Sequence, residues 1–463
     1  MIALKDKIIT LKYITLTAEE ILQDYRLAFK SREASLLGRK EVMGGRAKFG
    51  IFGDGKEIPQ LAMAKAFQKG DFRSGYYRDQ TVMFALGEHT ISEFFAQLYA
   101  HADLEAEPAT GGRQMNCHFA TRFLNPDGTW KNLTEHYNSS ADLSPTASQM
   151  SRLVGLAYAS RLYRELEELK TFVQFSKNGN EVAFGTIGNA SCAEGMFWEA
   201  INAIGVLHAP AVLAIWDDDY GISVPNEYQI TKGNISEVLK GFQRKKNSRD
   251  GFDIYTVKGW DYPALVDVFL KAATVAREKH IPAIIHVTEL TQPQGHSTSG
   301  SHERYKSRER LEWEKAFDGI RKMREWMIAE GIVEEDMLNE IEEEDRKEVE
   351  RIRDKAWEAY QKPIRMEINE VVDLISSLET ISSHASELRQ IREKLTRILA
   401  PTRKDIFIAV RQALVAVRSE ESKERQNLIE WKRQHEKENH QRYDSYLYSQ
   451  SHESALKVPE VKP

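Results

Sequence analysis

The sequence predicts an α/β fold in which a doubly wound parallel sheet carries helices on both faces, with a C-terminal helical extension. Three observations predict it. Four segments between residues 181 and 288 are almost continuously apolar or β-branched, as strands covered on both faces are. Segments with helical periodicity separate them, which is the order of a parallel sheet. Beyond Pro363 the chain is charged and helical in pattern, so we expect an α/β domain over residues 1–363 and a helical arm or linker over 364–463.

Local signals place the elements of the predicted sheet. The predicted strands are Glu181–Ile187, Ala211–Trp216, Asp253–Val257 and Ala283–Thr288. Apolar residues three and four positions apart, from Phe197 to Leu207, predict a helix between the first two strands. Asp261 and Pro263 suit the N-cap and the first turn of a helix between the last two. Strand, helix and strand therefore occur twice in succession.

The C-terminal part of the chain has only helical patterns. Past Pro363, apolar residues at helical spacing predict one amphipathic helix that Pro401 ends. Thr402 and Asp405 lie three residues apart and resemble a capping box that opens a further helix. From Ser419 onward apolar residues are sparse, which predicts a charged helix fraying into a linker.

Composition excludes several classes of protein. The 463 residues are 41% hydrophobic and 29% charged, as in globular proteins. The net charge of −6 lacks the excess of basic residues that is typical of nucleic-acid-binding proteins. Cys117 and Cys192 are the only cysteines, which excludes a disulfide framework and fits a reducing compartment. The longest nearly apolar run, Ala203–Trp216, is too short to span a bilayer. With charged residues inside the N-terminal segment and no signal peptide pattern, we expect a cytoplasmic protein without membrane partners.

Two motifs follow neighbouring predicted strands. Residues 185–195 form a Gly- and Ser-rich turn, which before a helix presents backbone N–H groups to phosphate. Asp217–Asp219 follow the next strand, and three adjacent carboxylates repel one another and are costly to desolvate. Since the carboxyl ends of parallel strands bind ligands in open α/β sheets, Mg²⁺ bridging to a phosphate is the expected partner. A solvated acidic loop is the alternative interpretation.

The spacing of these motifs resembles the thiamine-diphosphate-binding fold, whose motif is Gly-Asp-Gly, a helix and a strand, then Asn-Asn. The match is to the alpha subunit of the decarboxylating component of 2-oxo acid dehydrogenase complexes, over residues 17–362. Here carboxylate and amide exchange places, with Asn189 at the acidic position and Asp217–Asp218 at the Asn pair. The resemblance implies thiamine diphosphate and Mg²⁺, with Asn189, Asp218 and the Tyr220 carbonyl as metal ligands. A site that has lost its metal is the alternative.

Three further segments resemble the same family. Tyr77 and Arg78 match a Tyr-Arg pair that reaches the diphosphate, which an Arg fork suits. The Gly-Arg-Gln-Met run, Gly112–Met115, resembles the branched-chain enzymes more than the pyruvate enzymes. Residues 295–299 resemble the phosphorylation loop, with His296 as the catalytic residue that touches the cofactor and Ser297 as the kinase target of animal relatives. The cofactor-binding residues that the resemblance implies are Tyr77, Arg78, Gly188, Ala190, Ser191, Glu194 and His296.

The resemblance also implies a reaction. The family uses thiamine diphosphate to decarboxylate a 2-oxo acid oxidatively and to acylate the lipoyl group of a dihydrolipoyl acyltransferase. The glutamate that activates the cofactor ring belongs to the beta subunit, so we expect this chain to be inactive without a beta partner, in an alpha2beta2 heterotetramer or a fused equivalent reached through residues 364–463. A 3-methyl-2-oxobutanoate dehydrogenase is the main prediction. A pyruvate or acetoin dehydrogenase alpha subunit and a non-catalytic scaffold are the alternatives.

Overall fold

The computed structural model describes residues 7–444 and 454–460. Within these residues a parallel six-stranded sheet has the strand order β4-β3-β5-β6-β10-β9. Its strands are β3 (Phe72–Ser74), β4 (Asn138–Ser139), β5 (Ala183–Gly188), β6 (Ala211–Trp216), β9 (Asp253–Lys258) and β10 (Ala283–Thr288). The other β structure among these residues is two short strand pairs, β1 (Ile8–Thr10) with β2 (Thr15–Thr17) and β7 (Tyr220–Gly221) with β8 (Val224–Pro225), and two isolated bridges, Leu124 with Trp130 and Gln243 with Phe252. The predicted parallel sheet is confirmed.

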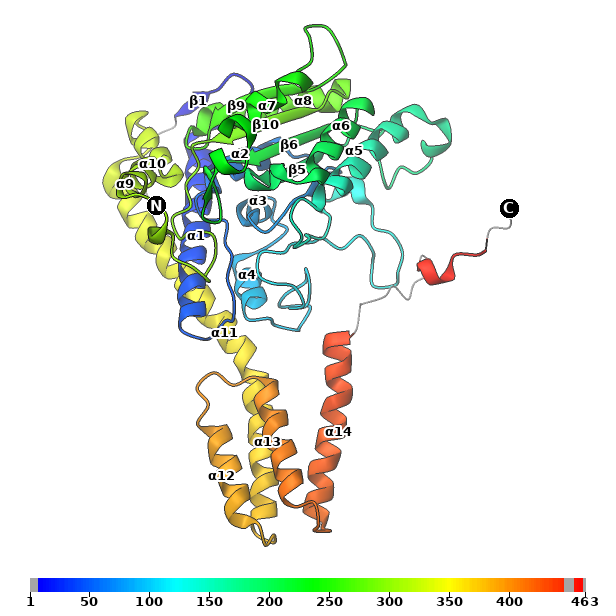
Figure 1. Ribbon diagram of the computed structural model, residues 1–463, viewed down its shortest axis with the longest axis vertical. Coiled ribbons are helices and arrows are strands. Elements are labelled where there is room, and N and C mark those ends of the chain that lie inside the picture. Colours follow the sequence, from blue (N-terminus) through cyan, green and yellow to red (C-terminus); the bar gives the residue numbers. More distant parts are fainter. Residues whose placement is uncertain (1–6, 445–453, 461–463) are drawn as a thin grey trace.

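Helices cover both faces of the sheet (Figure 1). Those of the α/β body are α1 (Ala18–Met43), α2 (Glu57–Ala66), α3 (Gln80–Ala85), α4 (Ile91–Leu98), α5 (Gln149–Glu165), α6 (Gly195–Val206), α7 (Ile235–Leu239), α8 (Tyr262–Lys279), α9 (Arg308–Ala316) and α10 (Gly319–Ala329). Side chains of β6 alternate between two cores, since Val212, Ala214 and Trp216 pack with α2 and α8 and the intervening residues pack with α5 and α6. This burial on both faces explains why the strands are nearly continuously apolar.

A helical arm projects from the α/β body (Figure 1). It contains the C-terminal half of α11 (Glu335–Glu379) with α12 (Ala385–Thr396), α13 (Arg403–Ala416) and α14 (Lys423–Asp444). A third core fills it, in which Val371, Leu388 and Val410 are buried from three different helices. Thr402 and Asp405 form the predicted capping box at the start of α13. Among the described helices, none combines the length and the apolar character that a membrane crossing needs.

Two predictions about the arm are wrong in detail. No new helix begins after Pro363, because α11 runs through that proline without a break. The aromatic ring of Tyr360 stacks on Tyr99 of the body and Ile364 is buried in the arm, so packing on both sides holds the helix across the missing N–H. The predicted single helix up to Pro401 is in fact the end of α11 and the whole of α12. A Ser- and Thr-rich turn, Thr380–His384, separates the two, because such side chains compete for backbone hydrogen bonds.

Candidate functional site

The two motifs lie side by side at the carboxyl edge of the sheet. Gly188, the last residue of β5, is opposite Trp216, the last residue of β6. Immediately beyond, the backbone N–H of Asn189 donates to the Trp216 carbonyl at 3.1 Å. The turn after β5 and the acidic run after β6 therefore meet, as the order of the strands predicts.

The three residues predicted as metal ligands converge on Tyr220. The Asn189 Nδ2 atom lies 3.2 Å from the Tyr220 carbonyl oxygen, and the Tyr220 N–H donates to Asp218 Oδ1 at 3.3 Å. Asn226 was not predicted, and its Oδ1 accepts from Asn189 at 2.7 Å. A carboxylate, a carboxamide and a backbone carbonyl are the hard oxygen donors that Mg²⁺ takes, so this set fits that ion once the Asn189 amide turns its oxygen inward. Within the described residues, His, Cys, Asp and Glu side chains form no metal-binding group of three or more.

The acidic run is balanced by protein groups, which the sequence analysis did not anticipate. Asp217 accepts from His286 Nε2 at 2.8 Å and from Asn226 Nδ2 at 2.9 Å. Asp219 pairs with the guanidinium of Arg310. Asp217 and Asp219 therefore have protein partners that reduce the repulsion among the three carboxylates. Asp218 is the remaining carboxylate at which a bound cation is expected.

Asp218 has a partner far away in the sequence. The Lys56 ammonium at the N-terminus of α2 lies 2.7 Å from Asp218 Oδ2. Burial is the largest single influence and would raise the pKa of Asp218. The charge and hydrogen bond of Lys56, together with the charges of Lys306 and Arg78, lower that pKa below its ordinary value. Sequence reasoning missed Lys56, because a single lysine in a Gly-Asp-Gly-Lys-Glu run does not differ from a surface lysine.

Arg78 and His296 form a second group at the same edge. The Arg78 Nη2 atom lies 3.0 Å from His296 Nδ1, within hydrogen-bonding distance. It also donates a hydrogen bond of 2.8 Å to the backbone carbonyl oxygen of His296. The Tyr77 ring packs edge-on against the His296 ring, with 6.3 Å between centroids. Burial and then the neighbouring Arg78 charge lower the pKa of His296 to about 3, so this ring is neutral at pH 7.

One small cavity joins the two groups. Its lining includes Arg78, Asp218, Tyr220 and His296, together with Gln292 and Lys306. The structure thus brings a predicted diphosphate contact, two predicted metal ligands and the predicted catalytic histidine to one small, partly open cavity. Convergent charged and polar side chains of this kind favour the binding of a charged ligand.

The other predicted cofactor contacts surround the turn after β5. Gly188 ends the strand, and Ala190 and Ser191 lie in a single 3₁₀ turn, Ala190–Ala193. Glu194 is the N-cap residue of α6, is exposed and makes no capping hydrogen bond with its side chain. Their contacts with a cofactor stay a prediction.

The serine that matches the kinase target of animal relatives lies inside its loop. Ser297 is only 8% exposed, and its hydroxyl is 2.7 Å from the Ser299 hydroxyl. Arg39 holds the loop by donating to the carbonyl oxygens of Gln294 and Ser297, both at 3.1 Å. Modification of Ser297 would therefore require this loop to open.

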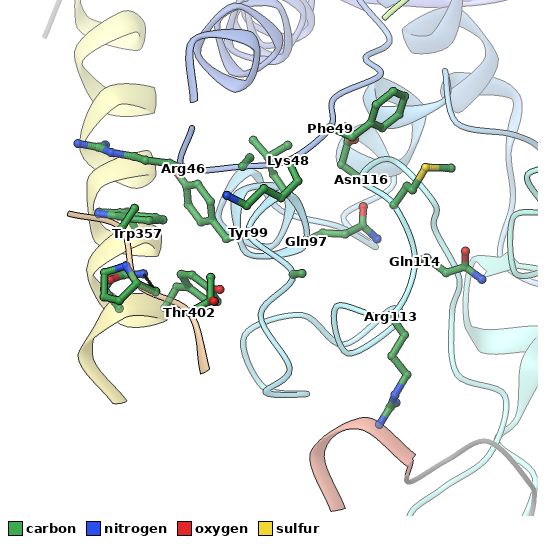
Figure 2. Close-up of a pocket in the computed structure, with 18 residues that line it drawn as sticks. Arg46, Lys48, Phe49, Gln97, Tyr99, Arg113, Gln114, Asn116, Trp357 and Thr402 are labelled. Carbon is green, nitrogen blue, oxygen red and sulfur yellow. Dashed lines mark hydrogen bonds between the residues drawn. The ribbon is translucent and has the colours of Figure 1, made fainter. Parts of the chain in front are cut away.

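The segment predicted to indicate branched-chain specificity lies elsewhere. Arg113, Gln114 and Met115 line a cavity of about 430 Å³ between the α/β body and the arm. Figure 2 shows Arg113 and Gln114 across this cavity from Trp357 of α11 and Thr402. The link between this segment and substrate choice stays a prediction. The segment lies next to the arm, because residues of both line the same cavity.

Comparison with known proteins agrees with the geometry. The family model described as dehydrogenase E1 component matches residues 25–365. The 2-oxoisovalerate dehydrogenase subunit alpha of Bacillus subtilis (strain 168) is 28% identical over 335 residues, which are 70% of this chain and 88% of that protein. The mitochondrial subunit alpha of Mus musculus is 24% identical over 72% of this chain and 66% of its own length. The mitochondrial subunit alpha 1 of Arabidopsis thaliana is 25% identical over 71% of this chain and 61% of its own length. The match therefore spans less than two thirds of the mouse and plant proteins.

Proposed function

This chain belongs to the family of dehydrogenase E1 components, as an alpha subunit of the branched-chain type, and on that premise we propose that it takes part in the thiamine-diphosphate-dependent oxidative decarboxylation of a branched 2-oxo acid. The substrate proposed is 3-methyl-2-oxobutanoate (2-oxoisovalerate), and the acyl acceptor is a lipoyl group on a dihydrolipoyl acyltransferase. A beta subunit completes the site, in an alpha2beta2 heterotetramer or a fused equivalent. The observation that carries the proposal is the single cavity lined by Arg78, Asp218, Tyr220 and His296.

The residues at this edge suit the two ends of a diphosphate site. Asp218, Asn189 and the Tyr220 carbonyl would hold Mg²⁺, and Arg78 would bind phosphate oxygens with the N–H groups of its planar fork. Thiamine diphosphate, when bound, supplies the electron sink that makes loss of CO₂ possible. The chain described here holds and neutralises the charged end of that group.

His296 contributes a neutral hydrogen-bond donor. Because Arg78 only donates, the His296 Nδ1 atom that faces it must be the acceptor, and the ring proton then resides on Nε2. The lowered pKa keeps this tautomer neutral at pH 7. His296 Nε2–H can therefore orient a phosphate or a substrate carboxylate without adding a second full charge beside Arg78.

A non-catalytic scaffold is the second candidate function, and one observation favours it. Asp217, Asp218 and Asp219 all have hydrogen-bonding or ionic partners within the protein, so each carboxylate is satisfied without a metal. A pyruvate or acetoin dehydrogenase alpha subunit is the third candidate.

Reconstitution with the beta partner tests these candidates. The complex, supplied with thiamine diphosphate and Mg²⁺, should release CO₂ from 2-oxoisovalerate faster than from pyruvate. The Arg78→Met variant should lose this activity, whereas Arg308→Gln, a change at an exposed pair on α9, should keep it. Faster turnover of pyruvate would favour the pyruvate enzyme. Lack of CO₂ release from any 2-oxo acid, together with lack of cofactor binding, would favour the scaffold.

A further inference from the structure

A buried lysine touches the proposed cofactor site without a role in the proposed reaction. The Lys56 side chain is 3% exposed, and its ammonium lies 2.7 Å from Asp218 Oδ2 and 2.9 Å from the Thr291 carbonyl oxygen. Its third partner is the side-chain oxygen of Gln292. An ammonium has three hydrogens, and all three have an oxygen acceptor here. The Lys56 side chain is therefore fixed in place by three oxygen acceptors, one of which belongs to Asp218.

The backbone around Lys56 fixes this position. Gly55 has a φ of +85°, and a Cβ atom there would lie 2.0 Å from the Thr291 carbonyl oxygen, so only glycine lets α2 begin this close to the loop after β10. The next residue, Glu57, pairs with Arg32 at 2.7 Å and is not available to Lys56. Among the described residues, Asp218 supplies the one carboxylate within hydrogen-bonding distance of Lys56.

Each of the three aspartates at this edge has a hydrogen-bonding or ionic partner within the protein. Asp217 is hydrogen-bonded to His286 and Asn226, and Asp219 is paired with Arg310. In the motif that the sequence resembles, the position of Asp218 holds a neutral asparagine. Because Asn189 is neutral in turn, Asp218 carries the one negative charge of the proposed ligand set, and the Lys56 ammonium lies 2.7 Å from it.

We propose that Lys56 is an internal cation of the diphosphate site, which offsets Asp218 and competes with a divalent metal for that carboxylate. The inference rests on the proposed function, since it assumes that this edge binds thiamine diphosphate. An unpaired Asp218 would repel a diphosphate unless a metal intervened, whereas Asp218 paired with Lys56 does not. Lys56 is thus a positioning residue that makes cofactor binding less dependent on Mg²⁺ than it would be with Asp218 alone.

The first test measures metal binding without the cofactor. Mn²⁺ serves as the probe, and free Mn²⁺ is followed by electron paramagnetic resonance in the full chain bound to its beta partner. Lys56→Met should bind Mn²⁺ about tenfold or more tightly, because a unit positive charge next to the ligand oxygen is gone. The double variant Lys56→Met with Asp218→Asn removes both charges and should lose that gain. Equal Mn²⁺ affinity in wild type and Lys56→Met, or a gain that survives the Asp218→Asn change, would overturn the proposal.

The second test measures the cofactor by calorimetry, with Mg²⁺ and with a chelator. The ratio of thiamine diphosphate affinities with and without Mg²⁺ should be about tenfold larger in Lys56→Met than in wild type. Lys65→Met is the matched control, because Lys65 lies in the last turn of the same helix and pairs with Asp24 at 2.8 Å, away from the site. It should leave both the ratio and the Mn²⁺ affinity unchanged. A purely structural role for Lys56 would lower the unfolding temperature and leave the ratio unchanged, which would also overturn the proposal.

The two tests separate this inference from the proposed function. If wild type binds no thiamine diphosphate even with Mg²⁺, the proposed function fails, and the Mn²⁺ comparison still decides whether Lys56 and a metal compete for Asp218. If wild type binds the cofactor but the Mg²⁺ ratio is the same in Lys56→Met, the proposed function stands and the role of Lys56 is refuted.

Discussion

Replacement of Arg73 by methionine should destabilise the α/β body more than any surface change. Arg73 lies on β3 and is 0% exposed. Its Nε donates to Asp79 Oδ2 at 3.0 Å, and its Nη2 donates to both Asp142 oxygens at 2.7 and 2.8 Å. One guanidinium therefore ties the Tyr77–Arg78 turn, which Asp79 follows, to the loop that contains Asp142.

The magnitude follows from what remains after the change. Asp79 keeps the Trp216 indole N–H at 3.2 Å and the Tyr76 N–H at 3.2 Å, but Asp142 keeps only the Phe119 N–H at 2.9 Å among its described partners. Breaking a buried ion pair from one side costs about 3–5 kcal/mol, so we expect a loss of at least about 4 kcal/mol in the free energy of unfolding.

Urea unfolding followed by circular dichroism measures this loss. Asp142→Asn keeps the shape and one ion pair of Arg73, so its loss should be smaller. Arg308→Gln breaks an exposed pair with Glu312 and should change the free energy of unfolding by less than about 1 kcal/mol. If Arg73→Met unfolds within about 1 kcal/mol of wild type, the cluster does not hold the body together and this reasoning is refuted.

Three other predictions concern the metal ligands, acid stability and the arm. Asp218→Asn should weaken Mg²⁺-dependent thiamine diphosphate binding far more than Asn189→Ala, because it removes the only carboxylate of the ligand set; equal losses in calorimetry would contradict the proposed exchange of carboxylate and amide. Burial lowers the pKa of His89 to about 3 from an ordinary 6.5, so below pH 6.5 the unfolded state takes up a proton that the folded state excludes, and stability falls with pH. His89→Gln should remove about 3 kcal/mol of the stability lost between pH 7 and pH 4.5 in urea unfolding, and an unchanged loss would refute the assignment. Limited proteolysis of residues 364–463 with and without the beta partner should show protection if the arm wraps that partner, and unchanged cleavage would identify a spacer.

The long strands could be predicted from the sequence, and the short ones could not. Ala211–Trp216 and Ala283–Thr288 have the predicted bounds, because strands buried on both faces leave a continuous apolar run. β3 and β4 were missed, since they have three and two residues and include the polar Arg73 and Ser139. Such strands exist because their neighbours hold them in the sheet, and no local pattern marks them.

The candidate site, too, could be predicted from the sequence only in part. Asn189 and Asp218 could be placed together, because the order of strands brings the ends of β5 and β6 to one edge. Lys56 could not be placed there, since 162 positions separate it from Asp218 and only the folded chain joins them. His286 and Arg310, the partners of Asp217 and Asp219, also come from later segments of the chain. They could not be predicted for the same reason.

The unbroken course of α11 has a mechanical consequence. Its 45 residues form a rod about 68 Å long, which starts beside α1 in the α/β body and ends inside the arm. Leu338 packs in the core of the body and Leu378 in the core of the arm, so both ends of the helix are held by packing. A force or torque applied to the arm is therefore transmitted to the α/β body through one continuous helix. A protein bound at the far end of the arm would be held at a fixed distance from the carboxyl edge of the sheet.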